Sequence, residues 1–395
     1  MPNYVINKYR GLYKRAYELY EEKKYKEAIE LLEVVCEKDG ANFEANFYLA
    51  EIYYNGLAGD IDYQKAFNHY LYAASNNITD AVFMVAMAYY DGKGTYQDYN
   101  QAFAWYNNAV KSGSTKPYYY LGQIYKNGYA GEKNLPKAIM WFLKAAKLND
   151  VAAQKECAIC YEELDEYENA AIMYLAASKN DDLYSTEKIA RYYTEGKYVP
   201  KSTSLSIKLY EKAEKLGSTI AKEKLAEIYE DAPKDENSKY AIDLYLEAAK
   251  DGNIDACNSL GRCYYYGIGV DPDEKQAYNW WLKASVGDNS SAMYSLAMLL
   301  SNPKSDQVEK DLVTAKNWLI RSAELGNKDA MYELAYYLEN GIGFVEKNIE
   351  VAYRWYNLAL ENGNDKAKVA LKRFRKNLFG KIIHHNSDIK DENQE

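Results

Sequence analysis

The chain has 395 residues, 48% of them hydrophobic and 27% charged, with a formal net charge of −9. This balance predicts a folded chain and excludes a disordered one. The acidic charge and the lack of a basic run argue against a nucleic-acid partner. The first residues lack the pattern of a secretory signal, and no apolar run approaches the roughly 18 residues of a membrane span. We therefore expect a cytoplasmic protein with no membrane span.

The first 40 residues predict a pair of helices. Apolar and small side chains recur there at helical spacing, among them Ala16, Tyr20, Ala28 and Leu32. This segment resembles a tetratricopeptide hairpin, and we treat residues 1–40 as an N-terminal hairpin domain.

A short phrase then repeats along the chain. An alanine is followed three residues later by tryptophan or a substitute, and four residues after that by a small residue. Clear copies run from 102 to 109, 138 to 145, 277 to 284 and 352 to 359. The closing small residues lie at 73, 109, 145, 177, 213, 248, 284, 322 and 359. Self-similarity at about 36 residues is typical of a solenoid, in which each unit buries its apolar face only against its neighbours.

A second phrase precedes the tryptophan phrase in each copy. It consists of an apolar residue, a small residue and, three residues on, tyrosine or leucine, as in Leu49, Ala50 and Tyr53. This spacing places the residues on one helical face. Glycine follows where such a helix should end, at Gly56, Gly92, Gly128, Gly196, Gly267 and Gly341. Each copy is therefore predicted to be an αα-hairpin, and its Gly-x-Gly sequences are turns because no strand precedes them.

The two phrases together resemble the Sel-like repeat (SLR) family, which is related to tetratricopeptide solenoids. Residues 137–146 and 260–270 match that pattern almost completely. The resemblance covers about residues 41–364 in nine copies and implies an all-α, right-handed α/α superhelical solenoid. Residues 365–379 are predicted to form a C-terminal capping helix, because solenoid ends need a polar face. Residues 380–395 are predicted to be a disordered polar tail.

Three copies depart from the pattern at the turn glycine. The fourth, about residues 152–181, has Leu164 there, the sixth has Ala232 and Pro233, and the eighth has Pro303. We expect these copies to interrupt the regular superhelical path.

No catalytic or metal-binding pattern is present. Cys157 and Cys160 have the spacing of half a zinc site, but they fall inside a predicted helix and no second pair follows, so they are interpreted as buried residues. His69 replaces a repeat tryptophan and is interpreted as a packed ring. We expect no enzymatic activity, no cofactor and no metal site.

The resemblance also implies a binding surface, because the first helix of each copy lines the concave side of such solenoids. The apolar residue that opens the second phrase, Leu49 in the first copy, is here called the repeat leucine. The groove-facing residues lie two positions before it, two positions after it and five positions after it. The candidate partner-binding residues on these positions are Phe47, Tyr54, Phe83, Met87, Tyr90, Tyr119, Arg191, Glu223, Glu227, Arg262, Tyr265, Tyr294, Met298, Tyr332 and Tyr336. The two ends of this set are aromatic and the middle is charged. Exposed aromatic and methionine side chains favour a protein partner, although packing against the next repeat would bury some of them.

The first hypothesis for function is a non-enzymatic scaffold or adaptor that binds a protein or peptide in the concave groove. The alternative is an immunity or inhibitor protein that occludes one toxin or enzyme, a role that some bacterial members of the family have. A third possibility, an enzyme or metal protein, has no motif to support it.

Overall fold

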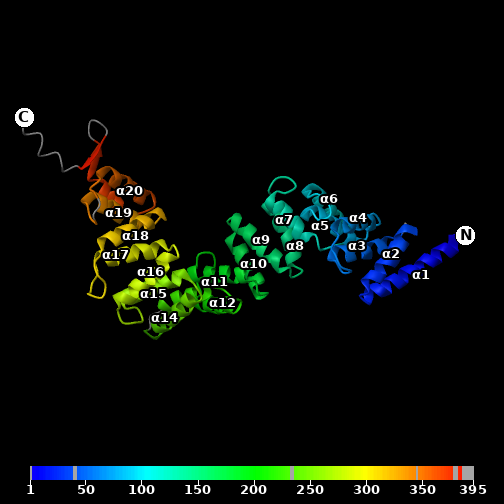
Figure 1. Ribbon diagram of the computed structural model, residues 1–395, viewed down its shortest axis with the longest axis horizontal. Helices are drawn as coiled ribbons and strands as arrows, with labels where there is room; N and C mark the ends of the chain where they lie inside the picture. Colours follow the sequence, from blue (N-terminus) through cyan, green and yellow to red (C-terminus); the bar gives the residue numbers. More distant parts are fainter. Residues whose placement is uncertain (1, 39–41, 232–234, 344–345, 377–380, 385–395) are drawn as a thin grey trace, which may run out of the picture. The chain divides into compact units, whose positions relative to one another are not determined.

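The computed structural model describes residues 2–38, 42–231, 235–343, 346–376 and 381–384. It contains two compact units, one made of residues up to 192 with 196–200, the other of residues 193–195 and those from 201 onward. Within each unit, helices pair in chain order as antiparallel hairpins (Figure 1). The predicted all-α repeat architecture is confirmed.

The first helix of each hairpin is here called the A helix and the second the B helix. The helices of the first unit are α1 (Pro2–Glu21), α2 (Tyr25–Lys38), α3 (Phe43–Asn55), α4 (Tyr63–Ala74), α5 (Thr79–Asp91), α6 (Tyr99–Lys111), α7 (Tyr118–Asn127), α8 (Leu135–Ala146), α9 (Val151–Glu163), α10 (Tyr167–Lys179) and most of α11 (Leu183–Glu195). The second unit contains the end of α11, then α12 (Thr203–Lys215), α13 (Ala221–Glu230), α14 (Asp235–Lys250), α15 (Ile254–Tyr266), α16 (Glu274–Val286), α17 (Ser290–Ser301), α18 (Leu312–Glu324), α19 (Lys328–Asn340), α20 (Ile349–Glu361) and α21 (Asp365–Leu371).

An asparagine, aspartate or serine immediately precedes most of these helices. The side chain of the residue before the helix accepts a hydrogen bond from a backbone N–H of the first turn, which would otherwise lack a partner. Asn42, Asp62, Asp98, Asn134, Asp150, Asp182, Ser202, Asn253, Asp273, Asn289, Asp311, Asn327, Asn348 and Asn364 all act in this way.

Glycine ends the A helices at the predicted positions. Gly56 and Gly267 adopt left-handed backbone angles, with φ of 61° and 75°, and each donates its N–H to the carbonyl four residues earlier. Gly92, Gly128, Gly196 and Gly341 do the same. The prediction of turn glycines is therefore confirmed.

The deepest core position is the residue after the repeat tryptophan. Tyr70, Tyr106, Phe142, Tyr174, Tyr245 and Tyr356 occupy it and are almost completely buried. Alanines of both helices surround these rings and allow the helices to approach closely. The repeat tryptophans Trp105, Trp280 and Trp355 are only half-buried.

The fourth copy keeps its hairpin without the turn glycine. Helix α9 ends at Glu163, and Asp165 adopts the left-handed conformation instead, with φ of 59°. In the eighth copy a longer loop joins α17 to α18. There Glu274 of the preceding copy accepts hydrogen bonds from the backbone N–H groups of Lys304 and Ser305 at 2.7 and 2.9 Å. In the sixth copy, Ala232 and Pro233 lie outside the described residues.

The prediction of a capping helix over residues 365–379 is wrong in its extent. Helix α21 ends at Leu371, and strands β1 (Phe374–Lys376) and β2 (Ile382–His384) then pair antiparallel, with Phe374 opposite His384. After the helix, the Phe374 ring packs on the rings of Tyr353 and Tyr356, with centroid distances of 5.7 and 5.8 Å. Strand β2 lies within the segment predicted to be disordered, and residues 385–395 lie outside the described residues.

Candidate functional surface

The candidate partner-binding residues lie on the A helices α3, α5, α7, α11, α13, α15, α17 and α19. Most are half-buried. Arg191 and Tyr336 are exposed, whereas Glu223 is buried. Packing against neighbouring repeats therefore uses part of the predicted surface.

In the first two copies, the buried B-helix tyrosine brings the groove residues together. The Phe47 and Tyr54 rings lie 6.0 and 6.1 Å from the ring of Tyr70. In the next copy, Phe83 and Tyr90 lie 5.9 and 6.1 Å from Tyr106.

The Tyr106 hydroxyl also lies 3.1 Å from the sulfur of Met87, the remaining groove residue of the second copy. One copy later, Tyr119 packs against Phe142, with ring centroids 5.9 Å apart, and its hydroxyl accepts a hydrogen bond from Gln123. These aromatic groove residues of α3, α5 and α7, here called the aromatic wall, each pack on the B-helix ring of their own copy and are only partly buried.

A hollow of about 420 Å³ opens at the N-terminal end of this wall. It is lined by Tyr13, Tyr17, Glu44, Phe47, Tyr48, Ile78, Thr79 and Asp80. Phe47 was predicted from the sequence, but the tyrosines of α1 and the two carboxylates were not. Glu44 and Asp80 are 36 residues apart and so occupy the same position in successive copies, which is the sequence pattern from which they could have been predicted.

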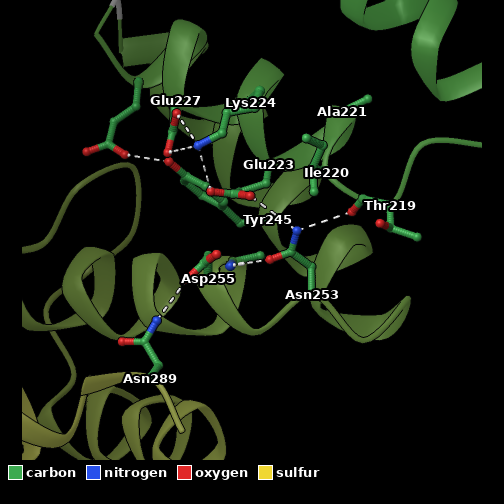
Figure 2. Close-up of polar contacts among 12 residues, drawn as sticks. Thr219, Ile220, Ala221, Glu223, Lys224, Glu227, Tyr245, Asn253, Asp255 and Asn289 are labelled. Atoms are coloured by element: carbon green, nitrogen blue, oxygen red, sulfur yellow. Dashed lines mark hydrogen bonds and ion pairs between the residues drawn. The ribbon is translucent and has the colours of Figure 1, made fainter. Parts of the chain in front are cut away.

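Glu223 and Glu227, in the middle of the candidate set, are part of a network of polar contacts and do not form an open acidic face (Figure 2). Lys224 pairs with Glu223 at 3.1 Å and with Glu227 at 3.0 Å. The Asn253 amide donates to Glu223 and to the carbonyl of Thr219, each at 3.2 Å. Burial raises the pKa of Glu223.

The assignment of Glu223 to the partner-binding surface is therefore wrong. Its side chain is only 3% exposed and is held by Lys224 of the same helix and by Asn253, the residue before α15, so it offers almost no surface to a partner. Glu227 keeps a side chain that is 45% exposed, so it remains a candidate.

In the last third, contacts between copies hold several groove residues. Arg262 forms an ion pair with Glu230 of the preceding copy. The Lys304 ammonium lies 3.9 Å from the centroid of the Tyr265 ring. Burial raises the pKa of Tyr294 to about 12.

The two candidate residues of α19, Tyr332 and Tyr336, differ in their surroundings. The Tyr332 ring packs 5.4 Å from that of Tyr356, whereas Tyr336 is 40% exposed. Met298 is half-buried on α17.

The described residues contain no group of three His, Cys, Asp or Glu side chains placed to hold a metal ion. Cys157 and Cys160 are fully buried in α9, and burial raises the pKa of each thiol. His69 is a packed ring, stacked on Tyr53, with Nδ1 2.8 Å from the Asn46 side-chain oxygen. Among the described helices, none is both long and apolar enough to cross a bilayer.

The family model of the Sel1 repeat matches most of the chain. Its eight matches cover residues 43–78, 79–114, 118–150, 184–218, 220–253, 254–285, 290–327 and 328–364. These are eight of the nine predicted copies. The fourth, which lacks the turn glycine, is not matched, although α9 and α10 form its hairpin.

A curated protein is similar to part of this chain. An uncharacterised Sel1-like repeat-containing protein of Schizosaccharomyces pombe is 29% identical over 130 residues, which are 32% of this chain and 17% of that protein. The chain therefore spans less than a fifth of the length of this curated relative.

Two crystal structures of repeat proteins are also similar. A protective antigen of uropathogenic Escherichia coli with an SLR fold is 24% identical, with 87% of this chain and 81% of that chain covered and a TM-score of 0.62. A Sel1 repeat protein of Oxalobacter formigenes is 23% identical, with 85% and 87% covered and a TM-score of 0.45.

Proposed function

The chain belongs to the Sel1 repeat family, whose repeats generally form protein-interaction scaffolds, and on this premise we propose that it is a non-enzymatic scaffold that binds a protein segment along its A helices. The observation that carries this proposal is the aromatic wall of the first unit with the hollow at its end. Partly exposed aromatic rings beside a concave pocket are the usual anchors of protein interfaces.

Photo-crosslinking in the native cells tests this proposal. A photoreactive phenylalanine analogue replaces Phe47, at the hollow, or Tyr96, which is 71% exposed in the loop between α5 and α6 and serves as the matched control. We expect a specific protein adduct from position 47 and none of that size from position 96. Equal adducts from both positions, or none from position 47, would contradict the proposal.

A purification from the same cells measures whether the wall carries the affinity. The tagged native chain is compared with Phe47→Ser and with Tyr96→Ser, after circular dichroism has established that each variant is folded. Loss of the crosslinked protein only from Phe47→Ser supports groove binding. One stoichiometric partner would favour the immunity or inhibitor role, and several related partners a general scaffold.

A further inference from the structure

The first three copies carry corresponding residues at the start of their A helices. Five residues before the repeat leucine lie Glu44, Asp80 and Lys116, each 36 positions after the last. Two residues before it lie Phe47, Phe83 and Tyr119. Each of these copies thus carries a charged residue three positions before an aromatic one.

Between the second and third copies, these positions hold a cation. The Lys116 ammonium lies 2.7 Å from a carboxylate oxygen of Asp80 and 5.9 Å from the centroid of the Phe83 ring. A carboxylate and a ring face attract an ammonium group together, the first by charge and the second by its quadrupole. The third copy therefore supplies a lysine that fills this position.

Between the first and second copies, the cation is missing. Glu44 and Phe47 provide the carboxylate and the ring, but the residue corresponding to Lys116 is Asp80, a second acid. The hollow of about 420 Å³ opens at this point, and none of the residues that line it is cationic. Lys116 itself is engaged with Asp80 and Phe83.

Helix α1 adds tyrosines to this hollow. The Tyr17 ring lies 5.0 Å from Tyr48, and Phe47 lies 5.6 Å from Tyr48, with the ring planes inclined. Burial, and after it the negative charge of Glu44, raises the pKa of Tyr13. The hollow thus combines several aromatic rings with an exposed carboxylate, the composition with which proteins bind cations.

We propose that this hollow binds a lysine or arginine side chain of the protein segment that the A helices hold. The inference rests on the proposed function and specifies the partner: a basic segment whose cation takes, between the first and second copies, the place that Lys116 takes between the second and third. Charge complementarity selects this occupant, because Asp80 is already paired with Lys116, whereas the exposed Glu44 carboxylate attracts a cation and repels an acidic group.

Small probes test the hollow without the natural partner. Nα-acetyl-lysine amide and Nα-acetyl-arginine amide are titrated into the full chain, and binding is followed by ligand-observed NMR. The control is the same lysine amide acetylated also at Nζ, which keeps the stem and removes the charge. We expect dissociation constants on the order of 1 mM for the cations and at least ~10-fold weaker binding of the neutral probe. Equal binding of charged and neutral probes would overturn the inference.

Two variants locate the site. Glu44→Gln removes the carboxylate, and we expect it to weaken cation binding about 5- to 10-fold. The exchange Asp80→Lys with Lys116→Asp retains an opposite-charge pair but places an ammonium at the hollow, so it should abolish binding of both cationic probes. Glu132→Gln, at an exposed site in the loop after α7, is the matched control and should leave binding unchanged. Undiminished binding to folded Glu44→Gln would contradict the assignment.

The two proposals can fail separately. A crosslinked partner at position 47 together with probes that bind regardless of charge would retain the scaffold and remove the cation site. Charge-selective probe binding without any crosslinked partner would retain the pocket chemistry and remove the scaffold.

Discussion

Arg262 of one copy forms a forked ion pair with Glu230 of the copy before it, with nitrogen–oxygen distances of 2.6 and 2.7 Å. The same carboxylate accepts a hydrogen bond from the buried hydroxyl of Tyr245 at 3.0 Å. Glu230 lies five residues after the repeat leucine, a position that the sequence places in the groove. Its contacts instead join the A helices of successive copies.

Other copies use this position in the same way. Lys126 pairs with Glu156 and Glu162 with Lys188 across neighbouring copies, and Glu339 of the ninth copy pairs with Arg373 of the segment that follows α21. Polar groups at this position therefore contribute to the stacking of repeats.

Arg262→Ala should lower the free energy of unfolding by about 1–2 kcal/mol, because it leaves the largely buried Glu230 carboxylate without its cation. The arginine side chain is 42% exposed, and solvent screening keeps the loss below that of a fully buried pair. Urea denaturation of the native and variant proteins measures this difference in the free energy of unfolding. Arg354→Ala removes a 73% exposed arginine paired within one helix and should change stability by less than about 0.5 kcal/mol. Equal effects of the two variants would contradict the structural role of Arg262.

Glu162 gives a pH-dependent prediction. Burial tends to raise its pKa, but hydrogen bonds from Tyr192, Tyr174 and Lys188 outweigh burial and hold the pKa below its ordinary value of 4.5. A carboxyl whose pKa is lowered on folding stabilises the protein above its unfolded pKa, and this contribution is lost as the pH falls through the folded pKa.

Glu162→Gln should therefore cost about 1–2 kcal/mol at pH 7, and the gap to the native chain should narrow below pH 4.5. Urea denaturation of both proteins between pH 7 and pH 3 checks this. A gap that stays constant or widens on acidification would show that the carboxylate is not stabilised by these three donors.

The repeat fold was predictable because its determinants are local and recur. The helix-ending glycine, exemplified by Gly56, and the small residues of the core phrases follow from backbone geometry and close packing, which a sequence pattern records directly. The chain end was not predictable in the same way. The packing of Phe374 on Tyr356 is a tertiary contact, and it overrides the helical tendency of the preceding residues.

The candidate surface was predictable in position but not in exposure. The spacing placed Phe47 and Glu223 on A helices, but whether a side chain faces solvent depends on its neighbours in the next copy. Asn253 and Lys224 enclose Glu223, whereas at Phe47 the copies leave a hollow. The contribution of Tyr17 came from a helix outside the repeat register, so the pattern contained no signal for it.

Cys157 and Cys160 should be unreactive in the folded protein. Burial raises the pKa of Cys157 to about 12 and that of Cys160 to about 11, so the reactive thiolate is scarce at pH 8. A disulfide-exchange reagent should modify half-buried Cys36 first and these two only as fast as the protein unfolds. Stopped-flow absorbance measures the rates, and all five thiols should react promptly in urea. Rapid native reaction of Cys157 would revive a redox role for the pair.

Gly261 and Trp281 are matched in size across the seventh copy. A Cβ atom at position 261 would lie 2.4 Å from Cδ1 of Trp281, so Gly261→Ala should lower the free energy of unfolding by about 1–3 kcal/mol through overpacking. The preceding copy pairs Ala226 with Tyr245, so Trp281→Tyr in the same chain should recover much of the loss.

Thermal and urea unfolding of the single and double variants measure this coupling. Gly11→Ala is the control, because a Cβ there meets nothing within 4 Å in the middle of α1, and alanine should stabilise that helix by up to about 1 kcal/mol. The Trp281 indole N–H has no hydrogen-bond partner among the described residues, so the exchange to tyrosine gives up no hydrogen bond there. Additive losses in the double variant would mean that the glycine serves some purpose other than making room for the ring.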